Sequence, residues 1–169
     1  MANSLPQGWI EASIGDAYYI IKEKGNEGVT PYLEIGDIDI HNKTYELKDK
    51  PSVKGCVVVV KNDVVVSRVR PTRGAISQIK EDLITASSAF TIIRSTKETN
   101  PKYLFYYLSH NEKFLNFLGD NCTGTMYPTV GESFIINYAI PIAPRAEQDR
   151  IVAKLDEVIN RIALIRKRI

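Results

Sequence analysis

Short runs of valine and isoleucine dominate the first half of the chain. In GCVVVVKNDVVVSRVRP, two valine-rich runs flank Lys61-Asn62-Asp63, and YYIIK and AFTIIRST repeat the pattern on a smaller scale. β-Branched side chains favour strands, and a polar triplet between two such runs is typical of a tight hairpin turn. We therefore expect strands on both sides of residues 61–63, further strands within YYIIK and AFTIIRST, and one or two short strands around Gly36.

The period of the apolar positions changes at Asn100. NPKYLFYYLSHNEKFLNFLGD predicts one buried amphipathic helix, with Asn100 as its N-cap, Pro101 in its first turn and Gly119 at its end. We expect its aromatic side chains to belong to the core rather than to stack on a ligand. The side chains at helical spacing are Tyr103, Tyr107, Phe114 and Leu118, with Leu104, Leu108 and Leu115 beside them.

A second helical pattern occupies the C-terminal residues. After Pro144, apolar residues alternate at spacings of four and three, which is the a/d pattern of a coiled coil. A helix this short is marginal in water without a packed face, so it must pack on its own domain or on another helix. We favour pairing with another chain or with a second half. The predicted seam consists of Ile151, Leu155, Val158, Ile162, Ile165 and Ile169.

Between these two helical patterns, NCTGTMYPTVGES predicts a polar, turn-rich loop, and FIINYAIPI predicts a return to strand. In the loop, Thr123 and Thr125 supply hydroxyls, Gly124 allows close backbone approach, and Tyr127 carries a ring that stacks or donates. Neutral groups of this kind position a polyanion rather than drive its affinity. An ordinary surface loop is the alternative interpretation.

The composition limits the number of domains and the class of protein but does not indicate a function. The 169 residues suit one domain, and 44% hydrophobic and 25% charged residues are ordinary for a soluble globular protein. No apolar run approaches the roughly 20 residues that span a bilayer, and MANSLPQGWIEA lacks the pattern of a secretory signal. Cys56 and Cys122 are isolated, so we interpret them as buried thiols in a reducing cytoplasm.

The charge is unevenly distributed although the net charge is only +2. Residues 1–40 have a net charge of −5, residues 61–80 of +4, and residues 145–169 of +3. Local basic clusters matter more than the total when the partner is a polyanion. This distribution directs attention to the basic segment that follows the valine runs.

Arg68 and Arg70 alternate along the end of the second valine run, so we expect both side chains on one face of a strand. Pro71 removes a strand donor, and Arg73 is expected on the exit loop. A guanidinium group can donate two hydrogen bonds to a guanine edge or to a phosphate. Lys61, in the preceding turn, is a further candidate. The alternative interpretation is a solubilising loop after a buried strand.

Catalytic patterns are missing from the sequence. It has no glycine-rich phosphate loop, His41 and His110 stand outside any metal-binding spacing, and Ser133 lacks the flanking glycines of a hydrolase nucleophile. The acidic residues of EIGDIDI, which are Glu34, Asp37 and Asp39, leave a magnesium nuclease as an alternative. We therefore expect a binding protein without catalytic residues, metal or cofactor.

The order of these motifs resembles a specificity-subunit module of type I restriction–modification systems. The resemblance covers nearly the whole chain and is most specific from Pro141 to Asp156, within IPIAPRAEQDRIVAKLD, where Ala143 replaces the first of two usual prolines. It implies an α+β fold, with a mixed, highly twisted β-sheet and packed helices in a DNA target recognition domain at residues 1–143. A long coiled-coil helix, for spacing and dimerisation, would follow at residues 144–169.

The resemblance also implies a function. Such a module is non-catalytic, reads one half of a split double-stranded DNA target, and directs a methyltransferase subunit that uses S-adenosylmethionine, and a restriction subunit where one exists. A natural half-subunit, a truncated product and a fragment are all compatible with one module and one helix. A half-subunit would dimerise through the helical seam and read a palindromic, interrupted target. A protein-interaction module that docks through this helix is the other alternative.

Overall fold

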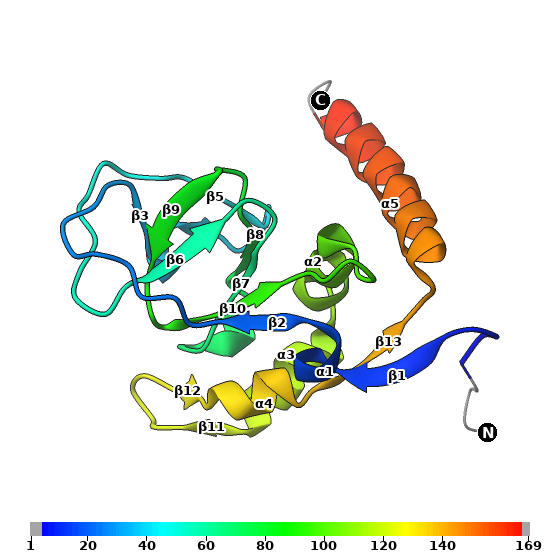
Figure 1. Ribbon diagram of the computed structural model, residues 1–169, viewed down its shortest axis with the longest axis horizontal. Coiled ribbons are helices and arrows are strands. Elements are labelled where there is room, and N and C mark those ends of the chain that lie inside the picture. The colour runs from blue at the N-terminus through cyan, green and yellow to red at the C-terminus, as the bar shows by residue number, and fades with distance from the viewer. Residues whose placement is uncertain (1–4, 167–169) are drawn as a thin grey trace.

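The computed structural model describes residues 5–166 and has an α+β architecture, as expected (Figure 1). The elements before the first long helix are β1 (Ile10–Ser13), α1 (Ile14–Ala17), β2 (Tyr19–Ile21), β3 (Tyr32–Leu33), the 3₁₀ turn η1 (Ile35–Asp37), β4 (Ile38–Asp39), β5 (Thr44–Tyr45), β6 (Val57–Val60), β7 (Val64–Ser67), the 3₁₀ turn η2 (Pro71–Arg73), β8 (Ile76–Gln78), β9 (Leu83–Ala86) and β10 (Phe90–Arg94). They are followed by α2 (Pro101–Ser109), α3 (Glu112–Asp120), β11 (Cys122–Thr123), β12 (Thr129–Val130), α4 (Glu132–Ile136), β13 (Ala139–Ile142) and α5 (Arg145–Arg166).

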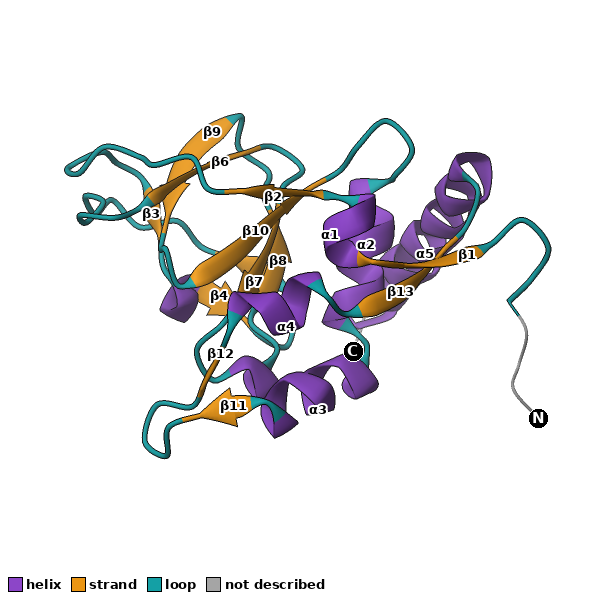
Figure 2. Cartoon of the chain, turned by 60° about the horizontal axis from the view of Figure 1, so that its bottom comes forward, coloured by secondary structure: helices purple, strands orange, loops and turns teal. Residues whose placement is uncertain are grey.

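Two small sheets carry most of the strands. One has the order β2-β10-β7-β8 with antiparallel neighbours, and the other has the order β3-β9-β6. The β3–β9 pair is parallel and the β6–β9 pair is antiparallel, so the second sheet is mixed. Separately, β1 near the N-terminus pairs with β13, which leads into α5 (Figure 2). The first sheet and the helices form the body from which α5 projects.

The two valine-rich strands do not form the predicted hairpin. Residues 61–63 do turn tightly, with the Asp63 amide donating to the Val60 carbonyl at 3.0 Å and Asn62 at a φ of 74°. However, β6 pairs with β9, whereas β7 pairs with β8 and β10. The hairpin prediction was therefore wrong, because the turn passes the chain from one sheet to the other.

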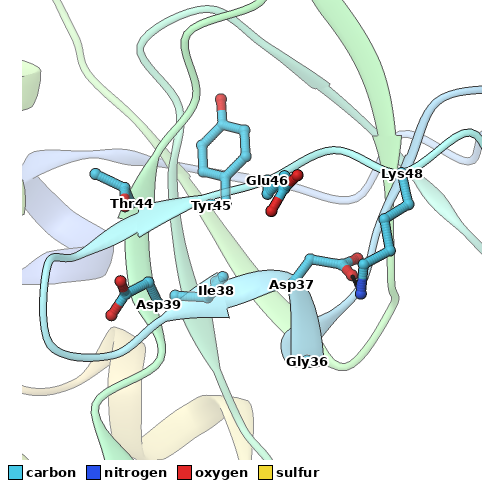
Figure 3. A pocket seen from close by; sticks show the side chains of 8 residues that line it. All are labelled: Gly36, Asp37, Ile38, Asp39, Thr44, Tyr45, Glu46 and Lys48. Carbon is cyan, nitrogen blue, oxygen red and sulfur yellow. Dashed lines mark ion pairs between the residues drawn. The ribbon is translucent and has the colours of Figure 1, made fainter.

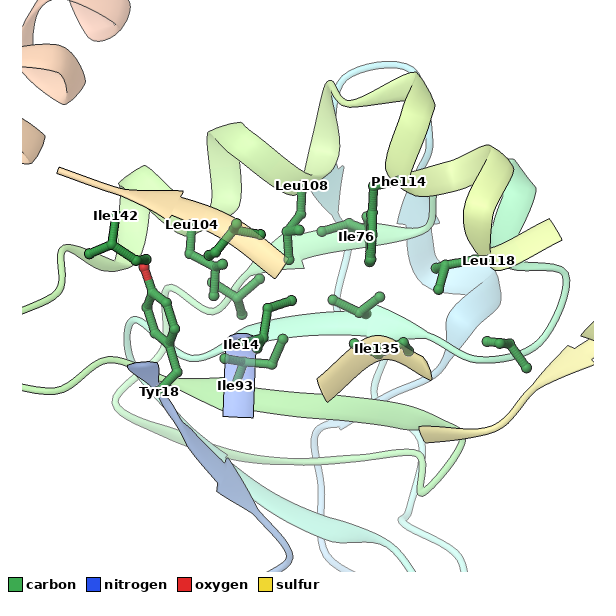
Figure 4. Close-up of a cluster of buried hydrophobic side chains, with 14 residues drawn as sticks. Ile14, Tyr18, Ile76, Ile93, Leu104, Leu108, Phe114, Leu118, Ile135 and Ile142 are labelled. Atoms are coloured by element: carbon green, nitrogen blue, oxygen red, sulfur yellow. The ribbon is translucent and has the colours of Figure 1, made fainter. Parts of the chain in front are cut away.

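Strand β7 lies between two cores, which explains its unbroken apolar sequence. Val64 and Val66 point into a cluster with the helices, while Val65 points into a second cluster with the β3-β9-β6 sheet. Strand β10 divides its side chains in the same way, with Ile93 on the helix side and Ile92 on the other. Figure 4 shows the helix-side cluster, in which Ile76 of β8 lies near Leu108 and Phe114.

The predicted aromatic helix is two helices. Asn100 caps α2 as expected, and its Oδ1 accepts from the Lys102 and Tyr103 amides. Asn111 then caps α3, so the chain turns at His110. Gly119 lies inside α3 rather than after it. A Cβ at this position would lie 2.6 Å from Cγ2 of Thr72. Its predicted role as a helix stop was wrong, and its small size serves the approach of α3 to η2.

Three further expectations are corrected in part. The segment predicted as strand at residues 134–142 begins inside α4, because Ile135 anchors that short helix in the core, and only β13 is extended. The short strands expected around Gly36 are present as β3 and β4, with η1 between them. Cys56 is buried as predicted, whereas Cys122 is only half-buried. Of the predicted core aromatics, Tyr103 and Phe114 are buried and Tyr107 is half-buried.

The C-terminal helix α5 follows Pro144, as the sequence predicted, and extends away from the body of the chain (Figure 1). Within residues 5–166, no helix combines the length and apolar character that crossing a bilayer requires.

Candidate nucleic-acid interface

The two segments that the sequence analysis selected lie side by side. The Val130 amide donates to the Arg68 carbonyl at 2.9 Å, and the Arg70 amide donates to the Pro128 carbonyl at 2.7 Å. Val69 forms an antiparallel bridge with Thr129 between these two bonds. The loop of residues 122–130, which is the β11–β12 hairpin, is thus held against the basic segment that follows β7. We call this combined surface the arginine–hairpin surface, formed by residues 68–73 and 122–130.

The backbone of the basic segment differs from the prediction. Strand β7 ends at Ser67, and Arg70 has a left-handed conformation with φ of 47° and ψ of 51°. This conformation costs a residue with a Cβ about 1–2 kcal/mol. The expectation that Arg68 and Arg70 share one face of a strand was therefore wrong. The backbone turns here because Pro71 begins η2 and because the Arg70 amide donates a hydrogen bond to the Pro128 carbonyl of the hairpin.

The three arginine side chains have different surroundings. Arg68 is half-buried and donates through Nη2 to the Ser88 carbonyl, so its side chain is bonded to the β9–β10 turn. Arg70 donates through Nη2 to the Met126 carbonyl at 3.3 Å, and its Cζ lies 4.8 Å from the Tyr127 ring centroid. Arg73 is exposed at the end of η2.

The carboxylates of the described part of the chain leave these arginines unpaired. None of the ion pairs formed among residues 5–166 includes Arg68, Arg70 or Arg73. By contrast, Arg94 binds the buried carboxylate of Asp63 through Nε at 2.7 Å and Nη2 at 2.8 Å. The positive charge of the basic segment thus stays available to an anion from outside.

The tip of the β11–β12 hairpin is exposed. The side chains of Met126 and Tyr127 are 76% and 63% accessible, and Thr123 and Thr125 are exposed beside them. The Thr123 hydroxyl donates to the Thr129 carbonyl at 3.4 Å, whereas Gly124 has a φ of 84° that favours glycine at this turn. The hairpin therefore presents hydroxyls and a ring beside the arginines.

Lys61 does not join this surface. It lies in the turn before β7, at the opposite end of that strand from Arg68, and its Nζ is 3.9 Å from a carboxylate oxygen of Asp82. Of the predicted binding residues, the structure brings together all but Lys61.

A pocket of about 410 Å³ opens at the arginine–hairpin surface. Arg70, Arg73 and Tyr127 line one side of it, and the residues around Gly36 line the other with Ile35, Ile38 and Ile40. Lys43 lies nearby and donates to the Gly74 carbonyl at 2.9 Å, while burial lowers the pKa of its ammonium group. Sequence reasoning missed the apolar wall and Lys43, because only the tertiary fold brings residues 35–43 against residues 68–75.

The acidic residues that suggested magnesium have other partners. Asp37 is buried, and its carboxylate lies 3.1 Å from the Lys48 ammonium group (Figure 3). The Lys50 ammonium group lies 2.9 Å from the same carboxylate. Burial raises the pKa of Asp37, but the two ammonium groups and the Glu34 amide outweigh it and hold that pKa below its usual value. Asp39 accepts from the His41 and Asn42 amides.

Residues 5–166 contain no group of three His, Cys, Asp or Glu side chains arranged to hold a metal ion. Because Asp37 is already paired with two lysines and Asp39 with backbone amides, the geometry gives no support to the magnesium nuclease.

Helix α5 presents most of its predicted seam to solvent. Leu155, Val158, Ile162 and Ile165 are exposed, Ile151 is half-buried, and Ile169 lies outside the described residues. The helix contacts the body through a different face, where Val152 is buried. The apolar stripe therefore remains uncovered in the single chain.

One known protein family matches the part of the chain that carries these features. The family described as "Type I restriction modification DNA specificity domain" matches residues 10–169, which include both the arginine–hairpin surface and α5. The chain belongs to this family. The resemblance inferred from the motif order is thereby confirmed.

This specificity domain is similar in sequence to a curated relative and in fold to solved structures. The chain is 28% identical over 175 residues to the type I restriction enzyme MjaVIII specificity subunit of Methanocaldococcus jannaschii, covering 98% of this chain and 39% of that protein. It matches the crystal structure of the HsdS subunit from Thermoanaerobacter tengcongensis with a TM-score of 0.81 and 25% identity, over 98% of this chain and 46% of the other.

A chain from a study of complex assembly and conformational transition of the type I R-M system gives a TM-score of 0.82 at 25% identity, over 97% of the domain and 45% of that chain. The specificity domain thus spans less than half the length of each of these relatives.

Proposed function

We propose that this specificity domain reads one half of a split DNA target and contributes no catalysis of its own. The observation that carries the proposal is the gathering of Arg70, Arg73 and Tyr127 at one pocket, where neither arginine pairs with a carboxylate of residues 5–166. Arginine forks recognise guanine edges and phosphates, and exposed hydroxyls position the backbone. Arg68, Thr123 and Thr125 complete the proposed contact surface, whereas Lys61 belongs to a separate flank.

The proposed partners follow from the family. We propose that the domain directs a type I methyltransferase subunit, and a restriction subunit where the system has one, to its DNA target in the cytoplasm. It needs no metal or cofactor for this role. We also propose that residues 1–143 read DNA and residues 144–169 space and pair the modules.

A second copy of the chain is the proposed occupant of the α5 stripe. Its apolar residues keep the four-and-three spacing of a coiled-coil seam, and Leu155, Val158 and Ile162 are exposed in the single chain. Two copies related by a two-fold axis would read a palindromic, interrupted target.

Adenine methylation in host DNA, mapped with and without this chain while the methyltransferase subunit is present in both, tests the function. We expect methylation at two short inverted sequence blocks separated by a fixed gap, and only when the chain is present. Methylation that does not depend on the chain would contradict DNA reading. The exposed stripe of α5 also favours a protein-interaction module without DNA readout. In a competition assay with the methyltransferase subunit present, that alternative predicts that excess random duplex DNA displaces labelled target DNA as well as unlabelled target DNA does.

A further inference from the structure

Helix α5 is joined to the body at two separate points on one of its faces. The first is Gln148, which is fully buried. Its Nε2 donates to the Ala143 carbonyl at 2.8 Å and the Glu98 carbonyl at 3.1 Å, and its Oε1 accepts from the Asn100 amide at 2.8 Å. A buried amide with three partners permits little movement, because each lost bond leaves a buried polar group unsatisfied.

Asn100 extends this first point into helix α2. The residue that caps α2 through its Oδ1 also donates from Nδ2 to Asp149 at 2.7 Å. Arg145 adds bonds from Nη1 to the Lys97 carbonyl at 2.8 Å and from Nε to Asp149 at 3.0 Å. The start of α5 is therefore bonded to the cap of α2.

The second point is Asp156, about two turns further along α5, or about 12 Å by helix geometry. Its carboxylate accepts from Lys102 Nζ at 2.8 Å and from the Tyr106 hydroxyl. Lys102 and Tyr106 are one turn apart on α2, and Val152 is buried between the two points. Beyond Asp156, every side chain from Glu157 to Ile165 is exposed. Two anchors on one face determine a direction, and the rest of the helix is a projecting arm (Figure 1).

Helix α2 links this arm to the arginine–hairpin surface. Leu104 and Leu108 of α2 pack in the same core as Val66 of β7 and Ile76 of β8. The basic segment leaves the end of β7, so the surface and the arm are attached to the same packed unit. Close-packed cores transmit orientation because they deform little.

We propose that Gln148 and Asp156 are positioning residues that fix the angle between α5 and the arginine–hairpin surface, and thereby the number of base pairs between two half-sites. This proposal rests on the proposed function and assigns residues to the angle of the helix rather than to its length. Adding one base pair to B-DNA moves a half-site by roughly 3.4 Å and rotates it by roughly 35°. A dimer with fixed arms therefore accepts one spacing and rejects its neighbours.

The first experiment needs no DNA. Spin labels are placed at Leu83→Cys in β9 and Asn160→Cys in α5, both exposed, with Cys122 replaced by serine and Cys56 left buried. Mixing with excess unlabelled chain ensures that most dimers hold one labelled copy. We expect a narrow distance distribution by pulsed electron resonance in the parent and a broad one in Asp156→Ala and Gln148→Glu.

Glu157→Ala is the matched control, because the ion pairs of the neighbouring Glu157 within residues 5–166 are with Lys154 and Arg161 of the same helix, each at 2.8 Å. Its distribution should stay narrow. Should Gln148→Glu fail to fold, Asp156→Ala and Tyr106→Phe still test the outer point, since both remove groups that are half-buried rather than fully buried. A distribution that stays narrow in these variants would overturn the proposal.

The second experiment measures binding to duplexes in which the spacing between half-sites varies one base pair at a time. In the parent and Glu157→Ala we expect one preferred spacing, and in Asp156→Ala the ratio of preferred to neighbouring affinities should fall towards one. An unchanged ratio despite a broadened distance distribution would overturn the proposal while leaving DNA reading intact. Absence of target binding by the parent would instead refute the proposed function, and the label distances alone would then decide whether Asp156 and Gln148 hold the arm.

Discussion

The guanidinium carbon of Arg70 lies 4.8 Å from the ring centroid of Tyr127, and Nη2 of the same arginine donates to the Met126 carbonyl at 3.3 Å. A cation from the segment after β7 thus stacks on the hairpin between β11 and β12. Such an exposed pair contributes about 0.5–1 kcal/mol, which is enough to bias the side chain towards one orientation. The pair joins two segments far apart in the chain into one surface.

Replacing Arg70 should therefore affect DNA recognition more than stability. We expect Arg70→Ala to weaken binding of the target by about 1–3 kcal/mol and to relax preference at one base pair, because a bidentate contact is lost. Gel-shift titrations on the target and its single-base variants measure both effects. Arg150→Ala, which removes an equal charge from a side chain on α5 that is 78% exposed, should leave the preference unchanged. Equal losses on all sequences would indicate a phosphate contact instead.

The apolar stripe of α5 predicts the oligomeric state. Introducing Glu at both Val158 and Ile162 should give a monomer in sedimentation experiments, because charge in a coiled-coil seam prevents close packing. Asn160→Glu places one such charge opposite the seam and should leave the dimer intact. A dimer that survives the double change would show that another surface pairs the chains.

The ion pair between Asp63 and Arg94 predicts that removing the Asp63 carboxylate strongly destabilises the fold. Asp63 is fully buried, accepts from the Val60 amide at 2.9 Å and binds Arg94 twice. We expect Asp63→Ala to lower the free energy of unfolding by about 3 kcal/mol, because the half-buried guanidinium of Arg94 and the Val60 amide lose their shared acceptor. Urea denaturation measures this, and Asp82→Ala, at a side chain 96% exposed, should change it by less than about 0.5 kcal/mol. A small effect of Asp63→Ala would mean that water replaces the carboxylate.

The contact between Gly119 and Thr72 predicts that the effect of Gly119→Ala on stability changes sign with the residue at position 72. Alanine normally stabilises a helix by about 1 kcal/mol relative to glycine, but here its Cβ would lie 2.6 Å from Thr72 Cγ2. Gly119→Ala alone should destabilise the domain. In a Thr72→Ser background, which lacks that methyl group, the same change should stabilise it. Thermal unfolding of the parent, the two single variants and the double variant completes this double-mutant cycle. Additive effects of the two changes on stability would contradict the contact.

Asp37 predicts sensitivity to acid. Its pKa in the folded chain lies below the usual value, so the unfolded state binds a proton more readily than the folded state. The stability that Asp37 contributes is therefore present above its unfolded pKa of about 4 and is lost as the pH falls through the folded pKa. Asp37→Asn should be less stable at pH 7 and should show a shallower decline on acidification. Urea midpoints between neutral and acidic pH test this, and parallel declines would contradict it.

The sequence alone was sufficient for features that depend on near neighbours. Asn100 caps α2 because its side chain reaches the amides two and three residues ahead, and α5 begins after Pro144 because local spacing and the proline decide it. The order of motifs was also sufficient for the family. The candidate residues of the arginine–hairpin surface could be selected for the same reason, since residue type and turn chemistry are local properties.

Only the tertiary structure decided which of these elements meet. The pattern around Lys61-Asn62-Asp63 predicts a hairpin, yet β6 and β7 enter different sheets. Each strand forms its ladder of hydrogen bonds with strands distant in sequence rather than with its neighbour. The left-handed Arg70, the apolar wall at Ile38 and the two anchors of α5 likewise depend on contacts between residues distant in sequence. Periodicity describes one element at a time, whereas these contacts arise when two separate cores close around β7.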